Sequence, residues 1–137
     1  MARFRYDALS RGAWILTGLL GVAWVGLEER GLGAVTLLAW MISLTGLLTA
    51  RARRNRREPV LRPSDLRWWL LAGAAAGALA GPIAALLIPL KVGLHAHPVP
   101  DFSTSDVLAV LGRIPIWAAA GGLLGAGAAL VERAARG

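Results

Sequence analysis

The sequence contains no cysteine and few charged residues. The absence of cysteine excludes a disulfide scaffold and thiol-based redox chemistry. Charged residues make up 17% of the chain, compared with roughly a quarter in soluble domains. Hydrophobic residues make up 56%, and the mean hydropathy is +0.58, which excludes a disordered tail and an ordinary soluble enzyme. What remains is one small domain of 137 residues whose solvent is mostly lipid.

Four long runs of the sequence carry no charged side chain. About 20 apolar residues at a rise of 1.5 Å cross a hydrocarbon core of roughly 30 Å. We therefore predict an all-α integral membrane protein with one transmembrane domain over residues 1–137, in which four transmembrane helices form two helical hairpins. The predicted spans are residues 12–27, 31–50, 67–90 and 114–131.

The first span is short and follows Arg3, Arg5 and Arg11, as the apolar region of a signal peptide would. No convincing small-x-small cleavage site follows Val25, and a second apolar run begins almost at once. A retained helical hairpin is therefore the preferred interpretation, and cleavage is the alternative.

The basic residues gather on one side of this four-span arrangement. Twelve of the 15 precede the first span, follow the second or follow the fourth; the exceptions are Arg30, Lys91 and Arg113. The positive-inside rule then places both termini and an Arg-rich loop at 51–66 in the cytoplasm, with an outer loop at 91–113. The predicted location is the bacterial cytoplasmic (inner) membrane.

Small residues recur every four positions in the third and fourth spans. Lipid provides no hydrophobic drive between helices, so close backbone approach through such residues favours association in the manner of GxxxG motifs. We therefore predict close packing of the third span against the fourth. The alternative is compositional bias in a GC-rich genome, with smooth helices facing a partner. The predicted packing residues are Gly73, Gly77, Gly81, Gly121, Gly125 and Ala129.

A capping-box pattern precedes the fourth span. Ser103 and Asp106 have the Ser-x-x-acid spacing that starts helices, and an apolar segment follows as far as Gly112. We predict a short helix at the outer membrane interface, a break at Arg113, and a fourth span with Pro115 in its first turn. The alternative is one long kinked helix over residues 105–131.

Away from their ends, the predicted spans contain no Asp, Glu, Lys, Arg or His; Arg67 stands at the very start of the third. Proton relays, ion-coupled transporters and voltage sensors need ionisable groups at membrane depth, and a haem held there usually needs a histidine. No nucleophile–base pair with plausible geometry stands out either. We therefore expect no enzymatic activity and no bound cofactor.

Histidine occurs in the predicted outer loop. His95 and His97 point to the same side of an extended segment, and Asp101 could supply a carboxylate. A Zn²⁺ or Cu²⁺ site, or a ligand site that includes Arg113, is therefore conceivable, although a His-x-His pair lacks the further protein ligands of most metal sites. The alternatives are contact with a neighbouring subunit, a pigment or a quinone headgroup, and an ordinary loop stiffened by prolines.

Arginines are concentrated directly after the second span. Such a cluster beside a membrane span determines topology, binds anionic lipid and can dock an acidic partner subunit. No aromatic residue is interleaved to stack on bases, so we expect no nucleic-acid binding. The predicted lipid or partner contacts are Arg51, Arg53, Arg54, Arg56 and Arg57.

An inert membrane interior, short loops and smooth helices together favour a non-catalytic accessory subunit of a larger membrane complex, such as a respiratory or photosynthetic one. Such a subunit would stabilise assembly through Gly/Ala helix packing and anionic-lipid contacts, with larger membrane subunits as partners. One alternative is a small homo-oligomeric channel with the third and fourth spans at its axis. Another is an outward-facing metal or ligand site at His95 and His97.

Overall fold

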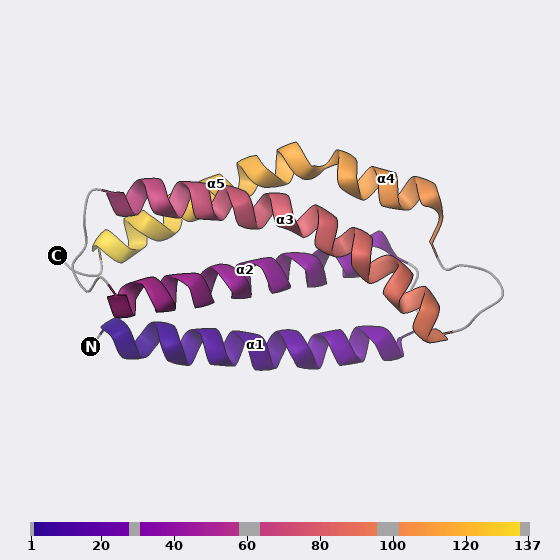
Figure 1. The fold of residues 1–137 in the computed structure, drawn as a ribbon, viewed down its shortest axis with the longest axis horizontal. Helices are drawn as coiled ribbons and strands as arrows, with labels where there is room; N and C mark the ends of the chain where they lie inside the picture. Colours follow the sequence, from indigo (N-terminus) through magenta and orange to yellow (C-terminus); the bar gives the residue numbers. More distant parts are fainter. Residues whose placement is uncertain (1, 28–30, 58–63, 96–101, 135–137) are drawn as a thin grey trace.

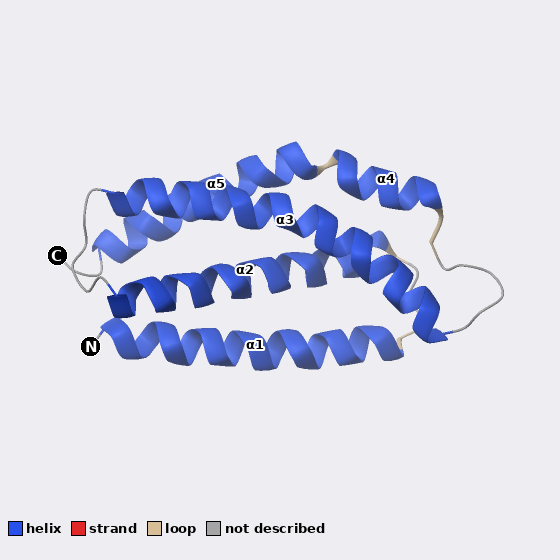
Figure 2. Ribbon diagram, in the orientation of Figure 1, coloured by secondary structure: helices blue, strands red, loops and turns tan. Residues whose placement is uncertain are grey.

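The computed structural model describes residues 2–27, 31–57, 64–95 and 102–134, and within them the only regular secondary structure is helix (Figure 2). Four of the five helices are long and apolar enough to cross a membrane, which confirms the prediction of an all-α protein with four candidate transmembrane helices and indicates an integral membrane protein. The helices are α1 (Ala2–Gly26), α2 (Leu32–Arg57), α3 (Ser64–His95), α4 (Thr104–Gly112) and α5 (Ile114–Ala134).

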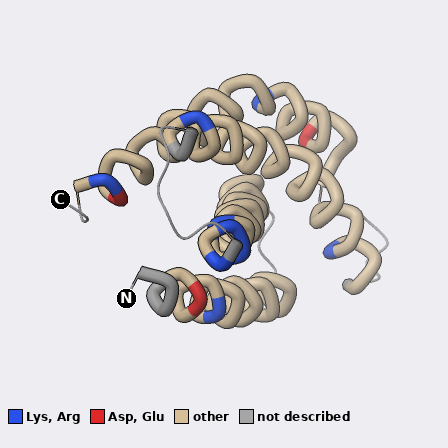
Figure 3. The backbone as a smooth tube through the Cα atoms, turned by 60° about the vertical axis from the view of Figure 1, so that its left-hand side comes forward, with Lys and Arg blue, Asp and Glu red and all other residues tan. Residues whose placement is uncertain are grey.

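The long helices lie side by side and alternate in direction (Figure 1). At one end of the molecule α1 begins, α2 ends, α3 begins and α5 ends; we call this the arginine-rich end, because α2 finishes there in a cluster of arginines (Figure 3). We call the opposite end the α4 end. The helix α3 is central, because it contacts α2, α4 and α5, whereas α1 packs mainly against α2.

The helices α2 and α3 extend into the predicted loops, so both of these loops are shorter than expected. Residues 51–57, assigned to the loop at 51–66, continue α2 to Arg57. This segment contains neither glycine nor proline, and arginine is a good helix former. Likewise α3 continues through Pro89 to His95, so Lys91 belongs to a helix and not to the predicted outer loop at 91–113.

The predicted break before the fourth span is present. The Ser103 hydroxyl accepts a hydrogen bond from the Asp106 backbone N–H, and the Asp106 carboxylate accepts one from the Ser103 N–H at 2.8 Å. This reciprocal capping box starts α4, which ends at Gly112. Arg113 separates α4 from α5, and Pro115 lies in the first turn of α5, where its missing N–H costs little. Two helices are found, and not the single long one.

The helix α3 contains Pro82 near its middle, and its two halves contact different neighbours. Figure 1 shows its later half leaning across the bundle towards α1 and α2. A proline inside a helix removes one backbone hydrogen bond and bends the helix. In the later half Ala84 and Ile88 join an apolar core that includes Val35 of α2 and Val110 of α4. The earlier half is left to pack against α5.

Hydroxyl groups connect α1 to α2. The side chains of Thr17 and Thr45 are buried and form a hydrogen bond at 3.1 Å, and Trp14 Nε1 donates to Thr49 Oγ1 at 3.0 Å. The Thr49 hydroxyl itself donates to the carbonyl of Thr45, one turn earlier. Threonines in membrane helices commonly satisfy their hydroxyls in this way. Polar side chains therefore help to align α1 with α2.

We predict that acid loosens the start of α4. Hydrogen bonds from the Ser103 backbone N–H and hydroxyl hold the pKa of Asp106 below its usual range. A carboxyl with a lowered pKa stabilises the folded state above its ordinary pKa of about 3.9, and this contribution is lost as the pH falls through the folded value. Amide hydrogen exchange of α4, compared with that of α5 over an acid series, measures the effect. Asp106→Asn should abolish the difference, because an amide side chain does not titrate in this range, and equal protection of α4 at every pH would contradict the prediction.

Candidate functional site

The helices α3 and α5 approach each other so closely that their backbones are in contact. A Cβ added at Gly73 would collide with the carbonyl oxygen of Gly121, and one at Gly121 would collide with the carbonyl oxygen of Gly73. Equivalent collisions would arise between Gly77 and the carbonyl oxygen of Trp117, and between Gly125 and that of Trp69. The backbones therefore touch along this surface, which we call the glycine seam. Only glycine permits such contact.

The two remaining predicted packing residues lie where the seam ends. A Cβ at Gly81 would meet the side chain of Ile114 at 2.5 Å, so a flexible side chain replaces backbone as its neighbour. Ala129 is half-buried, one turn beyond Gly125. The structure thus brings Gly73, Gly77, Gly121 and Gly125 together, with Gly81 and Ala129 at the margins.

Beyond the seam, at the arginine-rich end, three helices meet at a buried carboxylate. Glu132 of α5 accepts a hydrogen bond from Arg51 Nη2 of α2 at 2.6 Å and one from Trp69 Nε1 of α3 at 2.7 Å. Arg51 is 2% exposed and Glu132 is 8% exposed. A buried ion pair is tolerated only when its charges are paired and hydrogen-bonded, as both carboxylate oxygens are here. This cluster joins α2, α3 and α5.

Aromatic rings surround the guanidinium of Arg51. Its Cζ lies 5.6 Å from the ring centroid of Trp68, 5.7 Å from that of Trp69 and 5.8 Å from that of Tyr6 in α1. A guanidinium within about 6 Å of an aromatic face is attracted to the ring's negative face. Tyr6 therefore brings α1 to the same cluster, and all four long helices contribute to it.

Sequence reasoning did not identify this cluster, and it grouped Arg51 with the arginines that contact lipid or a partner. The structure corrects that assignment, because Arg51 is buried against Glu132 inside the bundle. One signal was present in the sequence. Glu132 lies in the last turn of α5, where the helix dipole disfavours an acidic side chain, so a specific basic partner was to be expected.

The other clustered arginines have different surroundings. Arg54 is half-buried with its Cζ 5.3 Å from the ring centroid of Trp68, and Arg53 is exposed. Arg56 is exposed and forms an ion pair with Asp7 of α1 at 2.9 Å. Of Arg57 the structure describes only the backbone, at the end of α2. Arg53 and Arg56 also line a polar pocket of about 240 Å³ between α1 and α2.

A second buried cation lies towards the α4 end. Lys91 of α3 is fully buried, and its Nζ is 4.6 Å from the ring centroid of Trp24 in α1. The sequence had placed Lys91 in an outer loop. Because α3 continues past Pro89, this lysine instead faces the ring of another helix, which connects α3 to α1.

The predicted metal or ligand residues fall mostly outside the described part of the chain. His97 and Asp101 lie outside the described residues, and of His95 only the backbone is described, at the end of α3. Arg113 is exposed between α4 and α5. Within the described ranges there is no group of three or more His, Cys, Asp or Glu side chains that could hold a metal ion. The site at these residues stays a prediction.

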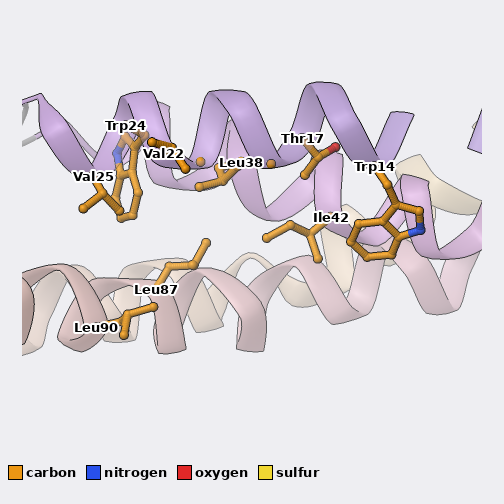
Figure 4. A pocket seen from close by; sticks show the side chains of 11 residues that line it. Trp14, Thr17, Val22, Trp24, Val25, Leu38, Ile42, Leu87 and Leu90 are labelled. Atoms are coloured by element: carbon orange, nitrogen blue, oxygen red, sulfur yellow. The ribbon is translucent and has the colours of Figure 1, made fainter. Parts of the chain in front are cut away.

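An apolar groove of about 460 Å³ runs between α1, α2 and α3 (Figure 4). The α1 wall extends from Trp14 to Val25, and Leu38 and Ile42 form the α2 wall. Leu87 and Leu90 of α3 face them across the groove (Figure 4). The hydroxyl of Thr17 also lines the groove and is hydrogen-bonded to Thr45. This lining suits a hydrocarbon ligand and offers no acid–base chemistry.

We predict that Gly121→Ala strongly destabilises the protein and that Gly127→Ala does not. The first substitution drives a methyl group into the carbonyl oxygen of Gly73, so α3 and α5 must separate, at a cost of about 1–3 kcal/mol or more. The second substitution is on the same helix, but its added methyl group meets no neighbouring atom within 4 Å. Thermal unfolding in detergent, followed by circular dichroism, compares the two. Equal melting temperatures would contradict the close approach.

We predict that Glu132→Gln costs about 3 kcal/mol or more, because it leaves the buried Arg51 guanidinium without its counter-charge. The double variant Arg51→Met, Glu132→Leu should recover part of this loss, since apolar side chains of similar volume replace buried ion pairs well. Recovery is incomplete because Trp69 Nε1 loses its acceptor. Asp7→Asn is the matched control. It breaks an ion pair whose arginine is exposed, so its effect should stay below about 1 kcal/mol. Chemical unfolding in mixed micelles measures all three, and equal effects of Glu132→Gln and Asp7→Asn would contradict the prediction.

The glycine seam, the Arg51–Glu132 cluster and the contact of Lys91 with Trp24 all hold helices together. The charged groups, Arg51, Glu132 and Lys91, contact side chains of other helices, and the groove between α1, α2 and α3 is apolar. Comparison of the chain with protein-family models, with curated proteins and with solved structures gives no match.

Proposed function

We propose that the chain is a non-catalytic accessory subunit of a larger membrane protein complex. In this proposal the hairpins α1–α2 and α3–α5 are embedded in the bacterial cytoplasmic membrane. The arginine-rich end and both termini face the cytoplasm, following the positive-inside rule, and α4 lies at the outer interface.

The main support for this proposal is that the buried charged side chains contact other helices of the same bundle. Arg51 and Glu132 bind each other across α2 and α5, and Lys91 packs on the ring of Trp24. Ionisable groups that move protons or ions line a water-filled path or a substrate cavity. These instead contact other helices near the two ends of the bundle. Such an interior supports a stable scaffold, which is what an assembly subunit contributes.

The outer faces of the first and last helices supply surface for partners. Large apolar side chains are exposed on both, and lipid or the helices of a larger subunit must cover them. The clearest examples are Leu16, Leu19 and Val22 on α1, and Leu123, Leu130 and Val131 on α5. Exposed arginines at the cytoplasmic end suit anionic lipid headgroups or an acidic subunit.

A homo-oligomeric channel is less well supported. A pore formed by the third and fourth spans would need their small-residue faces at its axis. In this chain those faces pack against each other, with the backbones of Gly73 and Gly121 in contact. The accessory-subunit proposal therefore accounts better for the glycine seam.

Affinity purification in a mild detergent, followed by native mass spectrometry, tests the proposal. We expect the tagged chain to be recovered with larger, unlike chains at a fixed stoichiometry, and deletion of its gene to lower the amount of that assembled complex. Leu19→Trp and Leu123→Trp test the α1 and α5 faces; at least one should reduce co-purification while leaving the melting temperature of the isolated chain unchanged. Recovery of the chain alone, or as a ring of identical copies, would contradict the proposal.

A further inference from the structure

Two pockets adjoin each other along the contact between α1 and α2. The apolar groove is lined by residues of the candidate membrane-spanning segments, and the polar pocket of about 240 Å³ lies nearer the arginine-rich end. They share a boundary, because Trp14 lines the groove and donates its indole N–H to Thr49, which lines the polar pocket. A ligand with a polar end and an apolar end could occupy both.

Helix periodicity places the two pockets on one face of the α1–α2 pair. On α1, Arg11 of the polar pocket precedes Gly18 of the groove by seven residues, about two turns. On α2, Arg53 of the polar pocket follows Ile42 of the groove by eleven residues, about three turns. Each pair therefore lies on the same side of its helix, and the pockets follow one another along the helix axes.

The polar pocket carries excess positive charge. Three arginines and one acid line it, and the acid, Asp7, is ion-paired with Arg56. Arg11 and Arg53 are exposed side chains on the two sides of the pocket. Two guanidinium groups from facing helices can bind one phosphate with several charge-assisted hydrogen bonds. The pocket therefore suits a single phosphodiester group.

The length of the groove matches that of one acyl chain. From Trp14 to Val25 its α1 wall rises about 16 Å, at 1.5 Å per residue, which is close to half of a roughly 30 Å hydrocarbon core. Gly18 and Gly21 leave space along this length because they have no side chains, and no atom lies within 4 Å of a Cβ added at Gly18. A partner helix would suit the groove alone, whereas a lipid also accounts for the cationic pocket in line with it.

We infer that this face binds one anionic glycerophospholipid from the leaflet at the arginine-rich end. Its phosphate lies between Arg11 and Arg53, and one acyl chain follows the groove past Gly18. The inference rests on the lipid contact and membrane orientation of the proposed function, and narrows them to a single site.

The headgroup is tested with the purified chain in nanodiscs of phosphatidylcholine containing a minor fraction of phosphatidylglycerol. Native mass spectrometry should find one phosphatidylglycerol retained per chain. Arg11→Gln together with Arg53→Gln should weaken retention about twenty-five-fold, because each basic side chain near an anionic lipid contributes about five-fold. The matched control is Arg67→Gln with Arg133→Gln, two exposed arginines at the same end that do not line the pocket. Equal loss in both double variants, or equal retention of phosphatidylcholine, would overturn the site.

The acyl chain is tested by photo-crosslinking with a phosphatidylglycerol that carries a diazirine in that chain. Crosslinks should concentrate on the groove walls around Gly18, Val22 and Leu87. Gly18→Leu fills the groove and should remove them, whereas Gly12→Leu, on the same helix and outside the groove, should not. Crosslinks spread evenly over exposed leucines such as Leu123 would indicate ordinary surrounding lipid and overturn the inference. Added glycerol phosphate should not compete, since a free phosphate lacks the chain; displacement by it would indicate an anion site alone.

The two proposals fail in different ways. A chain that retains phosphatidylglycerol but purifies without unlike partners keeps the lipid site and loses the accessory role. If the chain purifies with partners at fixed stoichiometry, but substitution of Arg11 and Arg53 leaves lipid retention unchanged, the accessory role is supported and the lipid site is contradicted.

Discussion

The carboxylate of Glu132 determines how the helices of this protein meet at the arginine-rich end. It accepts hydrogen bonds from Arg51 and Trp69, which belong to two other helices, and the ring of Tyr6 brings α1 to the same guanidinium. A lone buried charge is so unfavourable that each of these groups requires the others. The cluster therefore fixes the relative position of the helices at this end.

The glycine seam makes that cluster possible. Lipid supplies no hydrophobic force between helices, so α3 and α5 depend on backbone contact between Gly73, Gly77, Gly121 and Gly125. Because Gly125 touches the backbone of Trp69, the seam also sets the distance at which the indole reaches Glu132, two turns further along α5. Packing of small residues and pairing of charges are parts of one arrangement.

The other half of the molecule is held differently. Threonine hydroxyls and the Trp14–Thr49 hydrogen bond align α1 with α2, and Lys91 joins α3 to Trp24. Between these contacts lies the apolar groove. Gly18 and Gly21 line its α1 wall and have no side chains to fill it. The α3–α5 pair is thus joined by backbone contact, while the α1–α2 pair provides the surface on which we propose that a lipid binds.

Composition and local pattern were sufficient for the helices themselves. Long uncharged runs indicated four membrane helices, and Ser103 with Asp106 indicated the start of α4, because capping depends on residues three apart. The helix ends were less predictable: arginine can continue a helix or leave it, and α2 in fact continues to Arg57. Only the tertiary structure decided which arginine is buried. Arg51 and its neighbours look alike in sequence, and Arg51 differs because folding brings it to Glu132, 81 residues away. The same holds for Lys91, whose burial depends on where the ring of Trp24 lies in another helix, since the environment of a charge is set by contacts that local sequence does not contain.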